Sequence, residues 1–72
     1  MNMNTNLLKS QIILKGHTLS QVSHYLNVSK SSLYRKMYGE NEFTRKEMLK
    51  IKDLLDLSND AMMEIFFNEK VS

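Results

Sequence analysis

The segment 18–39 is the part of this 72-residue chain that most constrains its fold, because two short helical patterns lie only a few residues apart in it. In the first pattern, Leu19, Val22 and Leu26 recur at the spacing of one helix face. Thr18 precedes them and opens a T-x-x-Q sequence, which is typical of a capping box. The segment therefore predicts a helix that begins directly after Thr18.

The next residues predict a tight turn followed by a second helix. Asn27 lies where the turn needs a positive φ, which asparagine tolerates better than most residues. Ser29 is an N-cap candidate for the second helix. Leu33 and Met37 give that helix a narrow apolar stripe, and Gly39 favours its end.

The second predicted helix, about residues 29–38, is polar and basic outside its apolar stripe. Two short helices joined by a three-residue turn, with a second helix of this character, form the helix-turn-helix arrangement. In that arrangement the second helix enters the major groove of DNA, and here Lys30 and Ser31 supply donors in its first turn. One turn later it presents Tyr34 and Arg35, so the sequence predicts a DNA-recognition helix.

The pattern V-S-x-x-L-N-V-S-x-x-x-L resembles the core of the phage repressor and Cro type of helix-turn-helix, the XRE-like or lambda-repressor-like family. The residues that carry it are Val22, Ser23, Leu26, Asn27, Val28, Ser29 and Leu33. The runs YGENEF (38–43) and LSNDAMMEIFF (57–67) are similar to parts of small Cro-like and repressor-modulator proteins of phages from low-GC Gram-positive hosts. The resemblance covers roughly residues 7–67. It implies a single, compact, all-α domain of five helices over residues 1–72, with an ordered core at about 6–67.

The resemblance also implies which residues contact DNA. In the family, residues at and just after the N-cap of the third helix touch base edges. The matching positions are Ser29, Lys30, Ser31, Ser32, Tyr34 and Arg35. Phosphate contacts come from the start of the second helix and from the loop and helix after the third. The matching positions are Thr18, Lys36, Tyr38, Asn41, Thr44 and Arg45, with the backbone N–H groups near Thr44 as a further anion site.

A first helix is predicted before the helix-turn-helix. Asn6 or Thr5 is the expected N-cap, and the helix is expected to run to about Lys15, where Gly16 stops it. The residues expected to face inward are Leu8 and Ile12, with Leu7 and Ile13 as further candidates. Ser23, in the second helix, is expected to be a packing residue, because a larger side chain there would keep the second and third helices apart.

Two more helices are predicted after the recognition helix. Thr44 and Glu47 have the spacing of a capping box, so a fourth helix is expected from about Arg45 to Leu55. Ser58 is the expected cap of a fifth helix. Its expected inward face consists of Ala61, Met62, Ile65 and Phe66.

Met63 and Phe67, one turn apart, lie beside that inward face. Either the core covers both in part, or they form an association surface. The family often dimerises through its C-terminal part, and symmetric operators need two-fold proteins. We therefore expect a homodimer on DNA.

The distribution of charge suits nucleic-acid binding better than the formal net charge of +2 does. Residues 28–52 contain seven basic and three acidic residues, a net charge of +4, whereas residues 53–72 carry a net charge of −4. A basic half that faces phosphates and an acidic half that faces away would fit a DNA-binding protein. A solvated mixture of charges is the alternative interpretation.

Other functional classes lack support in the sequence. The chain has no cysteine, and His17 and His24 lack metal-ligand spacing to each other or to carboxylates, so we expect no metal and no cofactor. No nucleophile is combined with a base and an orienting group, so we expect no enzymatic activity. The first residues are unlike a signal peptide, and no apolar run approaches ~18 residues, so we expect a cytoplasmic protein with no membrane partner.

Two functions fit these features. The first is a sequence-specific, DNA-binding transcriptional regulator that occludes a promoter by binding an operator in double-stranded DNA. The alternative is a modulator, or anti-repressor, that binds the DNA-binding domain of a partner repressor through the same fold. Leu19 stands where the family commonly has glutamine, which removes one usual DNA contact. This difference and the apolar pair Met63 and Phe67 favour the alternative.

Overall fold

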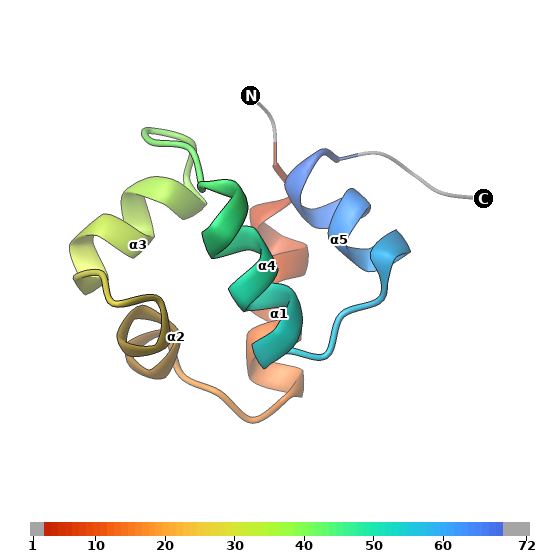
Figure 1. Cartoon of the computed structure of the whole chain (residues 1–72), viewed down its shortest axis with the longest axis horizontal. Coiled ribbons are helices and arrows are strands. Elements are labelled where there is room, and N and C mark those ends of the chain that lie inside the picture. The colour runs from red at the N-terminus through yellow and green to blue at the C-terminus, as the bar shows by residue number, and fades with distance from the viewer. Residues whose placement is uncertain (1–2, 69–72) are drawn as a thin grey trace.

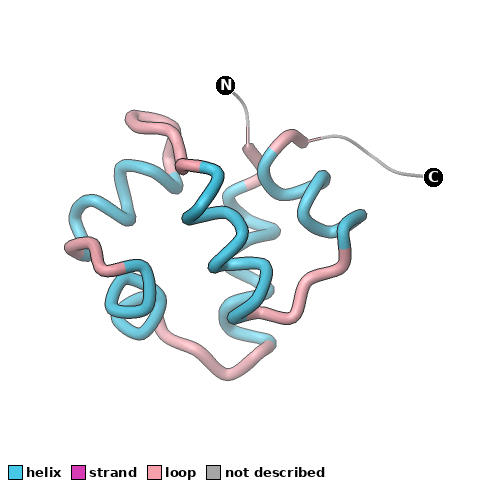
Figure 2. The backbone as a smooth tube through the Cα atoms, in the orientation of Figure 1, coloured by secondary structure: helices cyan, strands magenta, loops and turns pink. Residues whose placement is uncertain are grey.

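Five α-helices make up the regular structure of the computed structural model, which describes residues 3–68 (Figure 1). The helices are α1 (Thr5–Leu14), α2 (Leu19–Leu26), α3 (Lys30–Met37), α4 (Arg45–Leu54) and α5 (Asn59–Phe66). Residues 3–68 contain no strand, and short loops join the helices (Figure 2). The all-α fold class predicted from the sequence is therefore confirmed, with all five helices at the expected places.

Each helix begins at a side chain that accepts a hydrogen bond from a backbone N–H of its first turn. The N-caps are Asn4, Thr18, Ser29, Thr44 and Ser58. The last four were predicted, as were the capping boxes at Thr18 and Thr44. The prediction that Asn6 or Thr5 caps the first helix is wrong, since Asn4 Oδ1 accepts from the Leu7 N–H at 3.1 Å. The Thr5 hydroxyl instead donates to the carbonyl of Met37, at the far end of α3.

Four helices end in the same way, with a residue in the left-handed region followed by a hydrogen bond that spans the last turn. The left-handed residues are Gly16, Asn27, Gly39 and Asp56. The closing bonds run from the N–H of each following residue to a carbonyl five positions back, at 2.9, 3.0, 2.9 and 2.9 Å. The positive φ predicted at Asn27 is confirmed at 59°, and it reverses the chain between α2 and α3.

The core lies among all five helices and the two loops that flank α4. Its buried apolar residues are Leu8, Ile12, Val22, Leu26, Leu33, Met37, Phe43, Ile51, Leu55, Leu57, Ile65 and Phe66. Burial of each such side chain contributes roughly 1.5–3 kcal/mol relative to exposure. Ser23 is also buried, and its hydroxyl donates to the Ser20 carbonyl at 2.8 Å, so the packing role predicted for it is confirmed.

Ile13 departs from the predicted core. Its side chain is 74% exposed, so the expectation that it faces inward is wrong. A helix turns by about 100° per residue, which carries Ile13 away from the face on which Ile12 is buried. Leu14, next along the chain, is 73% exposed.

The packing order leaves α3 at one edge of the molecule. Helix α2 packs on α3 and α4, and α1 packs on α5. In Figure 1, α2 and α3 lie at one end and α5 at the other, with α4 and α1 between them. One side of α3 therefore faces away from α2 and α4.

Candidate nucleic-acid interface

The open side of α3 is a polar face, which we call the outer face of α3 and which consists of Ser31, Tyr34, Arg35 and Tyr38. All four side chains are exposed, whereas Leu33 and Met37 on the opposite side are buried. The rings of Tyr34 and Tyr38 are stacked, with centroids 6.2 Å apart and planes inclined by 10°. Four predicted DNA-contact residues thus lie together on one surface.

The first turn of α3 adds three more predicted base-contact residues. Lys30 and Ser29 are exposed, and Ser32 is partly buried. The Ser29 hydroxyl oxygen accepts from the Ser32 N–H at 3.0 Å as the N-cap. The hydroxyl proton of Ser29 remains available as a donor, because capping uses only an oxygen lone pair.

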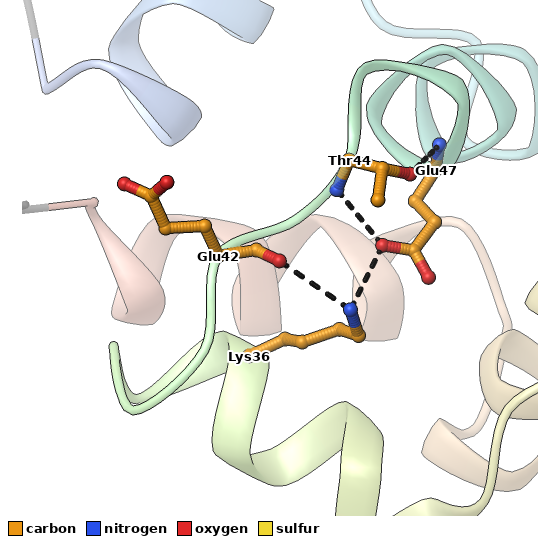
Figure 3. Close-up of polar contacts among 4 residues, drawn as sticks. All are labelled: Lys36, Glu42, Thr44 and Glu47. Atoms are coloured by element: carbon orange, nitrogen blue, oxygen red, sulfur yellow. Dashed lines mark hydrogen bonds and ion pairs between the residues drawn. The ribbon is translucent and has the colours of Figure 1, made fainter.

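Lys36 lies on the other flank of α3, where it is enclosed by the chain itself (Figure 3). Its ammonium is 3.1 Å from Glu47 Oε1 and donates to the Glu42 carbonyl at 3.3 Å. Both side chains of the ion pair are 14% exposed. The phosphate contact predicted for Lys36 stays a prediction, and its ammonium already has two partners that join α3 to α4.

Glu47 also completes the N-terminal cap of α4 (Figure 3). Its carboxylate accepts from the Thr44 N–H at 2.9 Å, and the Thr44 hydroxyl accepts from the Glu47 N–H at 3.1 Å. Burial alone would raise the pKa of the Glu47 carboxyl, but the hydrogen bonds from Thr44 and Lys36 outweigh it, so the pKa is lowered. The Thr44 N–H that was predicted to bind an anion therefore already holds a carboxylate.

The remaining predicted phosphate-contact residues lie at two separate places. Asn41 and Arg45 are exposed around the loop between α3 and α4, close in sequence to Thr44. Thr18 is exposed at the start of α2, where its N–H donates to Gln21 Oε1 at 2.8 Å. Leu19, the residue that differs from the family pattern, is partly buried against the core.

Sequence reasoning missed one basic residue beside the outer face of α3. Lys9, in α1, has its Nζ 3.2 Å from the hydroxyl oxygen of Tyr38 and 5.8 Å from the centroid of that ring. The two residues are 29 positions apart in the chain. No local signal in the sequence indicates which side chain of α1 lies next to α3.

Met63 and Phe67, which were predicted either to be partly covered by the core or to form an association surface, lie in α5 and at its C-cap and are neither buried nor fully exposed. Met63 and Phe67 are 36% and 42% exposed, so the core covers each only in part. Their neighbours in the chain belong to the inward face of α5: Met62 is partly buried, and Phe66 is buried. Association through this pair stays a prediction.

Metal and membrane chemistry find no support in the described part of the chain. Residues 3–68 contain no group of three or more histidine, cysteine, aspartate or glutamate side chains that could hold a metal ion. None of the helices over the same residues combines the length and apolar character that a membrane crossing requires.

Comparison of the chain with family models, with characterised proteins and with solved structures finds no match. The resemblance to phage repressor and Cro-type proteins therefore rests on the residue pattern of segment 22–33 and its flanking runs.

Proposed function

We propose that the protein is a sequence-specific transcriptional regulator that binds double-stranded DNA by placing α3 in the major groove. The outer face of α3 is the observation that supports this proposal most directly. It presents a guanidinium, two phenols and a hydroxyl on one exposed helix side, and among residues 3–68 neither Arg35 nor Lys30 forms an ion pair. An exposed helix with unneutralised cations fits the width and charge of the major groove.

Each residue of the interface has a defined role in this proposal. Arg35 donates two hydrogen bonds to O6 and N7 of a guanine, and Lys30 donates to a guanine or a phosphate. Ser29, Ser31 and Ser32 contact base edges at the start of the helix, and Tyr34 packs beside them. Phosphates are bound by Thr18, Tyr38, Asn41, Thr44 and Arg45, with Lys36 as a further contact if its ion pair opens. A homodimer would place two copies of α3 on a two-fold symmetric operator.

The test is DNA binding by the purified protein to its own upstream intergenic region and to random duplex, over a range of salt concentrations. We expect tight binding to the first and weak, salt-dependent binding to the second. Arg35→Ala should weaken specific binding by roughly 1–3 kcal/mol. Arg35→Lys retains the charge and loses the two-bond geometry, so it should lower specific affinity while keeping non-specific affinity.

Lys52→Ala serves as the control, because Lys52 lies in the last turn of α4 and outside the proposed interface. Equal operator affinity for the native protein, Arg35→Ala and Lys30→Ala would contradict the proposed role of α3.

A second function is favoured by the exposure of Met63 and Phe67 on α5 and by Leu19 in place of glutamine. In this alternative the protein is a modulator that binds the DNA-binding domain of a partner repressor. It predicts a stable complex with the cognate repressor and no DNA binding by the protein alone. Phe67→Ser should then abolish the complex, whereas Arg35→Ala should leave it intact.

A further inference from the structure

The first helix is attached to the C-terminal end of α3 through side chains. The Thr5 hydroxyl donates to the Met37 carbonyl, and one turn later Lys9 donates to the Tyr38 hydroxyl at 3.2 Å. The Lys9 ammonium also lies 5.8 Å from the centroid of the Tyr38 ring, within reach of a cation–π interaction. Two neighbouring turns of α1 are thus fixed against the last residues of the recognition helix.

The charge of Lys9 is held in place by a neutral group, and no carboxylate among residues 3–68 pairs with it. An ammonium has three donors, and Tyr38 takes one of them. Within residues 3–68, the ion pair between Lys36 and Glu47 is the only one, so no carboxylate pairs with Lys9. Because Tyr38 already restricts the Lys9 side chain in the free protein, the binding of a ligand by Lys9 costs less side-chain entropy.

Lys9 lies on the flank of α3 opposite to Lys36. Residues 36 and 38 are separated by about 200° around a helix, so their side chains point to opposite sides. The flank that contains Lys36 faces α4, whereas Tyr38 faces α1 and Lys9. The surface hollow beside Tyr38 is lined by residues without negative charge: Met3, Asn4, Thr5, Asn6 and Asn68. Among residues 3–68, a phosphate that approaches this flank meets one cation and several polar groups, and none of the lining residues carries a carboxylate.

We propose that Lys9 is a phosphate-binding residue of the DNA interface and that Tyr38 positions its ammonium. This inference rests on the proposed DNA-binding function and extends the interface from the helix-turn-helix to α1. Lys9 supplies a contact on the α1 flank, which the residues around the loop between α3 and α4 do not cover.

The experiment measures the logarithmic dependence of DNA affinity on salt for the native protein, Lys9→Gln, Lys9→Arg and the control Lys52→Gln. Lys52 is a matched control, because it is a partly buried lysine like Lys9 but lies in the last turn of α4. Loss of one phosphate contact lowers the slope by about 0.9 and the affinity at 0.1 M salt roughly five- to tenfold. We expect this loss in Lys9→Gln, equally on operator and random duplex, and the native slope in Lys9→Arg and Lys52→Gln.

The positioning role of Tyr38 is tested with Tyr38→Phe and the double variant with Lys9→Gln. If Tyr38 acts only through Lys9, in place of the phosphate contact of its own named above, the double variant binds DNA no more weakly than Lys9→Gln alone. Additive losses would show that Tyr38 contacts the phosphate independently and would overturn its positioning role.

Two results would overturn the phosphate-binding role of Lys9 and leave the proposed function standing. The first is an unchanged slope in Lys9→Gln while the native protein binds DNA with a steep slope. The second is an equal loss of slope in Lys9→Gln and Lys52→Gln, which would indicate a general effect of net charge. Absence of DNA binding by the native protein, with native-like thermal unfolding, would overturn the proposed function and this inference together.

Discussion

Two lysines flank α3, and their partners give their ammonium groups different surroundings. Lys36 is joined to the Glu47 carboxylate at 3.1 Å and is 14% exposed, whereas Lys9 is joined to the Tyr38 phenol at 3.2 Å and remains partly exposed. The carboxylate neutralises one ammonium, and the neutral phenol leaves the other charged. The comparison teaches that a lysine beside an exposed helix can be taken up by the fold or keep its charge for other contacts, according to the group to which it donates.

The corner between α3 and α4 has the character of a structural link. Its ion pair is mostly removed from solvent and is joined to the cap of α4, so α3 and the start of α4 depend on one carboxylate. Partly buried charged hydrogen bonds of this kind contribute more to stability than exposed ion pairs do. The contact of Lys9 with Tyr38, between α1 and α3, has one neutral acceptor and an exposed ring, so we expect this contact to contribute little to stability.

Removal of the Glu47 carboxylate should have the largest effect on the fold. Glu47→Ala deletes the capping box of α4 and leaves the Lys36 ammonium without its counter-charge. We expect a loss of about 2–3 kcal/mol in the free energy of unfolding, measured by urea denaturation. Glu40→Ala is the control, because Glu40 is exposed and forms no ion pair within residues 3–68. Equal unfolding free energies of Glu47→Ala and Glu40→Ala would contradict the structural role assigned to the corner between α3 and α4.

Truncation of the two lysines compares the corners directly. Lys36→Ala leaves Glu47 partly buried without its cation, and we expect a loss of about 1–2 kcal/mol in unfolding free energy. Lys9→Ala removes an exposed hydrogen bond to the Tyr38 phenol and the cation–π contact with its ring, and its expected effect on stability is below about 0.5 kcal/mol. Urea denaturation of both variants shows which of them loses more unfolding free energy. A greater loss in Lys9→Ala than in Lys36→Ala would reverse the assignment of the two residues.

Acid should lower the stability that Glu47 contributes to the corner between α3 and α4. The pKa of Glu47 is lowered in the folded protein relative to its ordinary value of 4.5. A lowered pKa contributes stability that is complete above the unfolded-state pKa and is lost as the pH falls through the folded-state pKa. We therefore expect the stability difference between the native protein and Glu47→Gln to be constant near neutral pH and to shrink below about pH 5. A difference that stays constant down to pH 3 would mean that Glu47 carries no such shift.

Tyr38→Phe should have the smallest effect on stability. It removes the hydroxyl that accepts from Lys9 but keeps the ring that stacks on Tyr34. We expect a change below about 0.5 kcal/mol in unfolding free energy, similar to that of the matched variant Tyr34→Phe. A loss above about 1 kcal/mol confined to Tyr38→Phe would make the α1 corner a structural link comparable to that at Lys36.

The features that could be predicted from the sequence are those encoded within a few neighbouring residues. The caps at Thr18, Ser29, Thr44 and Ser58 follow from a polar side chain that reaches the N–H three positions ahead. The left-handed turn at Asn27 also depends on local geometry, because few residues tolerate a positive φ. These signals fixed the helix order and placed the outer face of α3 without knowledge of tertiary contacts.

The features that could not be predicted depend on residues distant in the chain. Asn4, Thr5 and Asn6 were all able to cap α1, and the choice follows from the Met37 carbonyl that engages Thr5. Periodicity alone did not decide whether Ile13 faces the core. The pairing of Lys36 with Glu47 crosses a loop, so a lysine predicted to bind phosphate already has an internal partner.

The shared ending of α1 to α4 has a consequence for how far the residues on the outer face of α3 can vary. Each of these helices starts at its own cap and stops at its own left-handed residue, so its length is set by residues within it or beside it. The exposed side chains of Ser31 and Arg35 take no part in these starts and stops. Substitutions on the outer face of α3 can therefore change the chemistry of that surface while the lengths of the helices stay the same. A library randomised at Ser31, Tyr34 and Arg35 should yield folded variants in high proportion, and under the proposed function each variant should have its own preference among DNA sequences.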